Sequence, residues 1–176
     1  MASVTELTAT LSGLAEVEGK AELIVGRIVH LMPTGFGPGQ VGGRIYQSLD
    51  AYARRVGLGV ALPDNVGYAV TELNSGRQSF SPDASYFAGV VPTNLMDFVA
   101  GPPTLAVEVR RKHDYGTAAE MSMHAKRADY FEAGTLVVWD VDLVARVIRS
   151  YTIADPEHPV LYASTDLAAS EPAVPG

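Results

Sequence analysis

The run LAVEV at residues 105–109 places a carboxylate, Glu108, inside an otherwise apolar segment. If the run is a strand, alternation puts its three large apolar residues on one face and Glu108 on the other, beside Arg110. An ionised side chain costs several kcal/mol to bury unless it is paired, hydrogen-bonded or bound to a metal. The segment therefore predicts an interior strand whose carboxylate needs a partner.

Asp83 and Lys126 are the candidate partners of Glu108. Asp83 follows a proline, just ahead of a short β-like segment, and Lys126 falls in the apolar and aromatic stripe that helical spacing gives residues 118–133. Two carboxylates and a lysine at one place are the minimum equipment for binding a divalent metal and hydrolysing a phosphodiester. We therefore expect these three side chains to converge.

Length and composition predict a single domain. The chain has 176 residues, of which 47% are hydrophobic, enough for one core over residues 1–163, and the small residues and prolines of 164–176 predict a flexible C-terminal tail. No apolar run reaches the ~18 residues that a membrane span needs, the N-terminus lacks a signal-peptide pattern, and cysteine is absent. These features predict a cytoplasmic protein with no membrane partner.

Hydrophobic periodicity and turn residues predict a mixture of short strands and helices. Gly26 marks a hairpin within residues 22–32, and Asp140 and Asp142 are expected to mark the turn of a second hairpin. A glycine-rich loop at residues 33–43 is predicted to open a helix that ends at Gly57. The other predicted elements are helices at 5–17, 93–100 and 118–133, and strands at 58–62, 66–70, 84–87, 105–109, 136–141 and 144–153.

Four short motifs, taken in order, carry a resemblance to a known family. They are Ser81-Pro82-Asp83, Pro102-Pro103-x-Leu105-Ala-Val-Glu108-Val109-Arg110, Lys126-x-x-x-Tyr130-x-x-x-Gly134 and Val137-Val138-Trp139-x-Val141-Asp142. Together with Glu22-Leu-Ile-Val-Gly26 upstream, this pattern resembles the Uma-two family of restriction endonuclease-like proteins, part of the PD-(D/E)xK nuclease superfamily. The resemblance covers roughly residues 20 to 153. It implies an α/β (mixed α+β) fold, with a restriction endonuclease-like central mixed β-sheet flanked by helices and an N-terminal β-hairpin.

The resemblance also implies a site and a reaction. Asp83 and Glu108, helped by the backbone carbonyl of Val109, would hold Mg²⁺ or Mn²⁺, since hard cations prefer oxygen ligands. In much of the superfamily a lysine stands where this chain has Arg110, and in this family Lys126 matches it instead. Its implied role is to orient or help deprotonate the attacking water and to offset charge on the phosphate. The implied activity is metal-dependent hydrolysis of DNA phosphodiester bonds.

Two positions depart from the family pattern. Arg111 replaces a usual serine after the Glu108 strand, and Gln40 replaces a His or Glu that often opens the first long helix. An amide can still contact a metal-bound water, so Gln40 and Arg110 are second-tier candidates for the site. The departures leave open an alternative, a nuclease fold kept as a binding or regulatory module whose cleavage chemistry has decayed.

Other interpretations remain open. Asp83 could only stabilise a turn, Glu108 could pair with Arg110 or Arg111, and Lys126 could extend into solvent. A remote alternative is dinucleotide binding, because Gly37 to Gly42 fits the pattern G-x-G-x-x-G between a β-rich run and a helix.

DNA is the expected partner, with homodimerisation plausible because cutting a duplex usually needs two sites. The net charge of −7 argues against strong non-specific binding, since that affinity comes from lysines and arginines that neutralise phosphates. Contact with DNA must then be local. The cations expected to make it are Arg54, Arg55, Arg110, Arg111 and Lys112.

Overall fold

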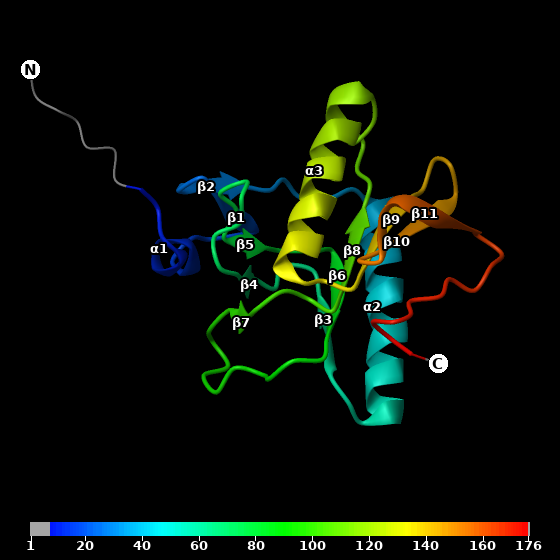
Figure 1. Cartoon of the computed structure of the whole chain (residues 1–176), viewed down its shortest axis with the longest axis horizontal. Coiled ribbons are helices and arrows are strands. Elements are labelled where there is room, and N and C mark those ends of the chain that lie inside the picture. The colour runs from blue at the N-terminus through cyan, green and yellow to red at the C-terminus, as the bar shows by residue number, and fades with distance from the viewer. Residues whose placement is uncertain (1–7, 176) are drawn as a thin grey trace, which may run out of the picture.

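The computed structural model describes residues 8–175, which form a mixed sheet with a long helix on each face (Figure 1). The sheet has six strands in the order β11-β10-β9-β8-β6-β3, and only β8 and β9 pair in parallel. The predicted mixed α+β fold is confirmed. The strands are β3 (Val60–Pro63), β6 (Ala84–Phe87), β8 (Leu105–Val109), β9 (Val137–Asp142), β10 (Val147–Thr152) and β11 (Asp155–Ala163).

The helices are α1 (Leu11–Ala15), α2 (Phe36–Val56) and α3 (Thr117–Ala133). Helix α3 connects the parallel strands β8 and β9, as a crossover helix must when two parallel strands are neighbours. Glycines in the left-handed conformation end both long helices, Gly57 with φ 69° after α2 and Gly134 with φ 106° after α3. Both ends agree with the sequence prediction.

Strand alternation in β8 divides the core between the two long helices. Leu105, Val107 and Val109 are buried in a cluster that includes Leu49 and Ala53 of α2. Ala106 packs on the other face in a cluster with Tyr130 of α3. Glu108 therefore points to the α3 side of the sheet, as the alternation predicted.

Two smaller sheets lie beside the main one. The N-terminal hairpin joins β1 (Ala21–Ile24) to β2 (Arg27–His30), and its turn at Val25 and Gly26 uses positive φ angles of 50° and 64°. These angles suit a tight two-residue hairpin turn, so the predicted hairpin is confirmed. The other small sheet contains β4 (Tyr68–Ala69), β5 (Ser79–Phe80) and β7 (Val99–Ala100).

Three sequence predictions need correction. The glycine-rich segment is not a loop, because α2 begins at Phe36 and includes Gly37 to Gly42 within its first turns. That geometry removes the glycine loop on which the dinucleotide alternative depended. The short helix predicted at 93–100 is absent from the described chain, where turns lead into β7.

The segment after residue 163 packs in part against the main core. It contains no helix or strand in its described part, yet Ala173 and Val174 are buried in the cluster on the α2 face. The hydroxyl of Tyr52 donates a hydrogen bond of 2.8 Å to the carbonyl of Pro175. The flexibility expected for residues 164–176 stays a prediction. Within residues 8–175, no helix is both long enough and apolar enough to cross a membrane.

Candidate active site

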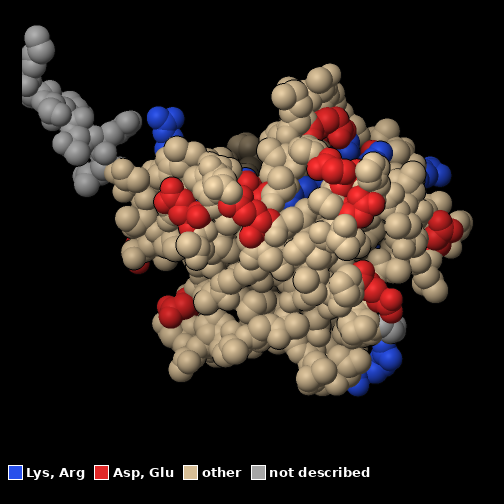
Figure 2. Space-filling model, viewed as in Figure 1, with Lys and Arg blue, Asp and Glu red and all other residues tan. Residues whose placement is uncertain are grey.

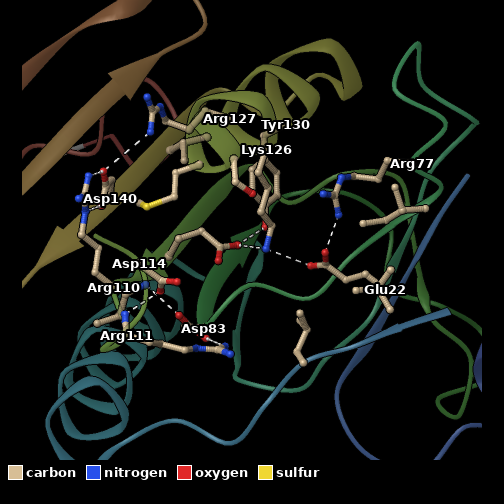
Figure 3. Close-up of a pocket in the computed structure, with 18 residues that line it drawn as sticks. Glu22, Arg77, Asp83, Arg110, Arg111, Asp114, Lys126, Arg127, Tyr130 and Asp140 are labelled. Carbon is tan, nitrogen blue, oxygen red and sulfur yellow. Dashed lines mark hydrogen bonds and ion pairs between the residues drawn. The ribbon is translucent and has the colours of Figure 1, made fainter. Parts of the chain in front are cut away.

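A cavity of about 280 Å³ lies between the N-terminal hairpin, strand β8 and helix α3 (Figure 3). Charged side chains from distant parts of the sequence point into it. Its wall includes the three residues predicted to converge, Asp83, Glu108 and Lys126. The other ionisable residues of the wall are Glu22, Arg77, Arg110, Arg111, Asp114, Arg127, Tyr130 and Asp140.

Strand register explains why the two predicted carboxylates meet. Strands β6 and β8 are antiparallel with Ala84 opposite Val107, so the preceding Asp83 falls beside Glu108. The Asp83 amide donates to the Val107 carbonyl at 2.9 Å and extends this pairing. Opposed residues of an antiparallel pair present their side chains on the same face. Both carboxylates therefore reach the same cavity.

Lys126 joins this group from α3. Its Nζ lies 2.8 Å from Glu108 Oε1 and 3.0 Å from Glu22 Oε1, so it bridges two carboxylates. The hydroxyl of Tyr130, one turn further along α3, donates to Glu108 Oε1 at 2.6 Å. The alternative in which Glu108 pairs with Arg110 or Arg111 is not seen in the described residues, where Lys126 is its ion-pair partner.

Asp83 is held by donors on both of its oxygens. Oδ2 accepts the backbone amide of Val109 at 2.8 Å, which orients the carboxylate toward β8. Oδ1 accepts Lys20 Nζ at 2.8 Å and Arg111 Nη2 at 3.3 Å. Lys20 also pairs with Asp64 at 2.6 Å. Asp83 is thus part of a charged cluster rather than a turn-stabilising residue alone.

A buried network anchors the hairpin to the rest of the site. Arg77 Nη1 donates to Glu22 Oε2 at 2.5 Å and its Nε donates to Asp129 Oδ2 at 2.8 Å. The second oxygen of Glu22 accepts the Ser81 amide at 3.0 Å. Because Ser81 lies two residues before Asp83, this network ties the hairpin to the segment that carries Asp83.

Arg110, which directly follows β8, belongs to a separate network with Asp140 of the neighbouring strand β9. Its Nε and Nη2 donate to the two oxygens of Asp140 at 2.8 and 2.7 Å, and both of its terminal nitrogens bind Glu120. Asp140 is almost fully buried within β9 and does not mark the hairpin turn, which corrects the sequence prediction. Asp142 does mark it, since its Oδ1 accepts the amides of Val144 and Ala145.

The two proposed metal-binding carboxylates differ in electrostatics. Burial raises the pKa of Glu108, Lys126 opposes that shift, and the negative charges of Asp83 and Glu22 add to it. Burial also acts on Asp83, but Lys20, the Val109 amide and Arg111 outweigh it and lower the pKa of Asp83. Although Lys126 is largely buried, Glu108 and Glu22 raise its pKa, so its ammonium stays protonated at neutral pH.

Hard oxygen donors are present for a divalent cation. The Asp83 and Glu108 carboxylates and the Val109 carbonyl come from neighbouring β segments, a donor set of the kind that Mg²⁺ uses when it keeps several waters. No group of three or more acidic or histidine side chains with metal-binding geometry occurs in the part of the chain that the structure describes.

Several predicted residues lie elsewhere. Gln40 is exposed in the first turns of α2 and does not line the cavity. Arg54 and Arg55 lie in the last turn of α2, and Lys112 is exposed in the loop after β8. None of these four lines the cavity, whereas the second-tier residue Arg110 does.

Sequence reasoning missed Lys20, Glu22 and Arg77. Glu22 carried a usable signal, because it stands in the apolar run of β1 as Glu108 stands in β8. Lys20 and Arg77 carried none, since each stands in a polar stretch and finds its partners more than 40 residues away.

Two of three comparisons with known proteins found a match. The family model Uma2, described as "Putative restriction endonuclease", matches residues 8–176. Among solved structures, a match is the crystal structure titled as a putative nuclease belonging to DUF820 from Anabaena variabilis ATCC 29413. It has a TM-score of 0.68 and 16% identity, with 94% of this chain and 90% of that chain covered. At this identity the likeness concerns the fold. Among curated proteins, none matched.

Proposed function

The chain belongs to the Uma2 family of restriction endonuclease-like proteins, and from this premise and the cavity chemistry we propose that it is a metal-dependent endonuclease acting on DNA. The observation that carries the proposal is the meeting of Asp83, Glu108 and Lys126 at one cavity. Asp83 and Glu108 are proposed as metal ligands with the Val109 carbonyl. Lys126 is proposed as the catalytic cation.

The cofactor in this proposal is Mg²⁺ or Mn²⁺. Such an ion would polarise a phosphoryl oxygen and lower the pKa of a bound water. The raised pKa of Glu108 supports the assignment, because burial beside two other carboxylates leaves its charge undercompensated. On the Asp83 side, Lys20 and Arg111 now supply the positive charge that the ion would bring.

The protein's own residues divide the remaining work. Lys126, protonated and tied to Glu22 and Glu108, provides fixed positive charge for a phosphate whose negative charge grows during hydrolysis. A protonated amine cannot accept a proton, so Lys126 orients water and offsets charge instead of acting as the base. Tyr130 and Glu22 act as positioning residues, Tyr130 through Glu108 and Glu22 through Lys126.

Nicking of supercoiled plasmid tests the proposal. Purified protein with Mg²⁺ or Mn²⁺ should convert the plasmid to the open circle, and EDTA should stop it. Asp83→Asn, Glu108→Gln and Lys126→Met should each remove the activity, while Glu18→Gln, an exposed acid outside the cavity, should leave it unchanged. Equal nicking by all four variants would identify a contaminating nuclease and overturn the proposal.

A second candidate is a binding module that has lost cleavage. The observation in its favour is that Asp83 Oδ1 already has two cationic partners, Lys20 and Arg111. Calorimetry with Mn²⁺ separates the two candidates. If the protein is a nuclease, the wild-type protein should bind Mn²⁺ and both Asp83→Asn and Glu108→Gln should lose that binding. If the site has decayed, neither the wild-type protein nor the two variants should bind Mn²⁺.

The charge distribution supports local contact with DNA. Figure 2 shows acidic side chains spread over the face that carries α3, with few basic side chains between them. DNA contact is therefore proposed at the cavity, where Arg111, Arg127 and Lys126 gather. Arg110 is excluded from a direct phosphate contact because Asp140 and Glu120 already occupy it. A homodimer is proposed for cutting both strands.

A further inference from the structure

Arg127 differs from the other arginines that line the cavity. Arg77 is held by Glu22 and Asp129, and Arg110 is held by Asp140 and Glu120. Arg111 binds the Met32 carbonyl and Asp83. Each of these three guanidinium groups has acceptors within hydrogen-bond distance. Arg127 has none among the described residues, because its Nε and Nη1 are buried without a hydrogen-bond partner.

The surroundings of Arg127 hold the guanidinium without satisfying it. Its central carbon lies 4.2 Å from the centre of the Tyr151 ring, a stacking contact that uses the flat face and leaves the N–H groups unpaired. Its ion-pair partner is Asp140, whose Oδ2 lies 3.8 Å from Nη1, beyond hydrogen-bond distance. Asp140 already accepts two hydrogen bonds from Arg110. A positively charged donor whose N–H groups lack a hydrogen-bond acceptor favours an anionic ligand that can accept from them.

The location of Arg127 relative to the proposed catalytic centre suggests what that acceptor is. In the pairing of β8 with β9, Glu108 stands opposite Asp140, so the acid beside Arg127 is the cross-strand neighbour of the proposed metal ligand. In Figure 3, Lys126 points toward Glu22 whereas Arg127 points toward Asp140, so the two neighbours on α3 reach different parts of the cavity wall.

We propose that Arg127 binds a backbone phosphate next to the one that is cut, through a guanidinium presented to the cavity by its stack on Tyr151. This inference rests on the proposed function and adds a second phosphate subsite to it. The ligand class is a nucleic-acid strand with a phosphate flanking the scissile one. A guanidinium suits this role because its planar fork can donate two hydrogen bonds to phosphate oxygens.

Salt-dependent binding tests the subsite without cleavage. Fluorescence anisotropy would follow a labelled duplex oligonucleotide in EDTA from 50 to 200 mM salt, with wild-type protein, Arg127→Met and Arg127→Lys. Loss of one phosphate contact should lower the slope of log affinity against log salt by about 1. Between 50 and 200 mM salt, the affinity of Arg127→Met should therefore fall about fourfold less than that of the wild-type protein. Arg127→Lys keeps the charge and should recover most of the slope.

The matched control is Arg149→Met, which removes the same charge from a residue that pairs with Asp142 outside the cavity. Its slope should stay at the wild-type value. Thermal unfolding shows whether Arg127 also stabilises the fold. Arg127→Met should unfold at or above the wild-type temperature, because it removes buried donors that lack a hydrogen-bond partner. If the slope of log affinity against log salt for Arg127→Met equals that of the wild-type protein or of Arg149→Met, the proposed subsite is wrong, while the proposed function still stands. Absence of DNA binding by wild-type protein would overturn both the subsite and the proposed function.

Discussion

Lys20 Nζ lies 2.8 Å from Asp83 Oδ1, so the carboxylate proposed to bind a metal ion already has a lysine as its partner. The ammonium is largely buried and is shared with Asp64. A divalent ion that uses the same oxygen must displace it. Lys20 is therefore a competitor for the proposed metal site, and its removal should strengthen metal binding.

We predict that Lys20→Met raises the affinity for Mn²⁺ at least about tenfold, because a hydrogen bond between charged groups contributes roughly 1.5–3 kcal/mol. Isothermal titration calorimetry measures the change. Lys112→Met, which removes the same charge from an exposed loop position, should bind Mn²⁺ as the wild-type protein does. Unchanged or weaker binding by Lys20→Met would mean that the Lys20–Asp83 pair does not compete with the ion.

Tyr130→Phe should reduce nicking while the fold is retained. The ring stacks on Phe80 with centroids 4.1 Å apart and would stay in place, whereas the 2.6 Å hydrogen bond to Glu108 would be lost. We expect about tenfold slower nicking and a loss of roughly 0.5–1.5 kcal/mol of unfolding free energy. Tyr68→Phe is the matched control, because it removes a buried hydroxyl bonded to Ser85 outside the cavity. An equal loss of activity in both variants would assign the effect to stability.

Local patterns predicted the parts of the site that depend on local geometry. Glu108 was identified because alternation within β8 is a property of the strand itself, and Lys126 because helical periodicity fixes which side of α3 it occupies. The meeting of Asp83 with Glu108 depends on the register between β6 and β8, which the sequence did not reveal without the family resemblance. The Lys20–Asp83 contact joins residues 63 apart and had no local signal.

The glycine-rich segment shows why propensity misled the fold prediction. Glycine disfavours a helix, so residues 33–43 were predicted as a loop. In the structure, Gly42 is buried where α2 packs on Asp83 and Val109, and an added Cβ would lie 3.4 Å from the Asp83 carbonyl. Long-range packing of α2 therefore outweighs the local preference, and single-sequence patterns do not contain it.

Acid should weaken the fold through Glu22. Burial raises the pKa of Glu22, but the positive charges of Lys126 and Arg77 outweigh burial and lower this pKa from 4.5 to about 2. In the unfolded chain this carboxyl takes up its proton near pH 4.5, so the stabilisation is complete above that pH and is lost as the pH falls toward 2. Glu22→Gln should cost about 3–5 kcal/mol at pH 7, because it leaves Arg77 and Lys126 short of a buried partner.

Urea unfolding at pH 7, 4 and 3 would measure this effect. The free energy of unfolding of the wild-type protein should fall across this range, and the gap to Glu22→Gln should narrow as Glu22 loses its charge. Glu18→Gln, at an exposed position, should follow the wild-type curve. A gap that stays constant from pH 7 to pH 3 would contradict the assigned role of Glu22.

Substitutions of the adjacent glycines Gly42 and Gly43 would show whether α2 needs glycine at these positions for packing or for backbone freedom. An added Cβ on exposed Gly43 would meet nothing within 4 Å, so Gly43→Ala should raise the free energy of unfolding by about 0.5–1 kcal/mol through helix propensity. At Gly42 an added Cβ would already lie 3.4 Å from the Asp83 carbonyl, so we expect a larger side chain to push α2 away from that segment. Gly42→Leu should therefore cost about 1–3 kcal/mol and weaken Mn²⁺ binding, because separating α2 from Asp83 moves a proposed ligand. Urea unfolding and calorimetry measure these changes. If Gly43→Ala instead destabilised the protein, the segment would need the freedom of a loop, and the helical account of α2 would be wrong at its start.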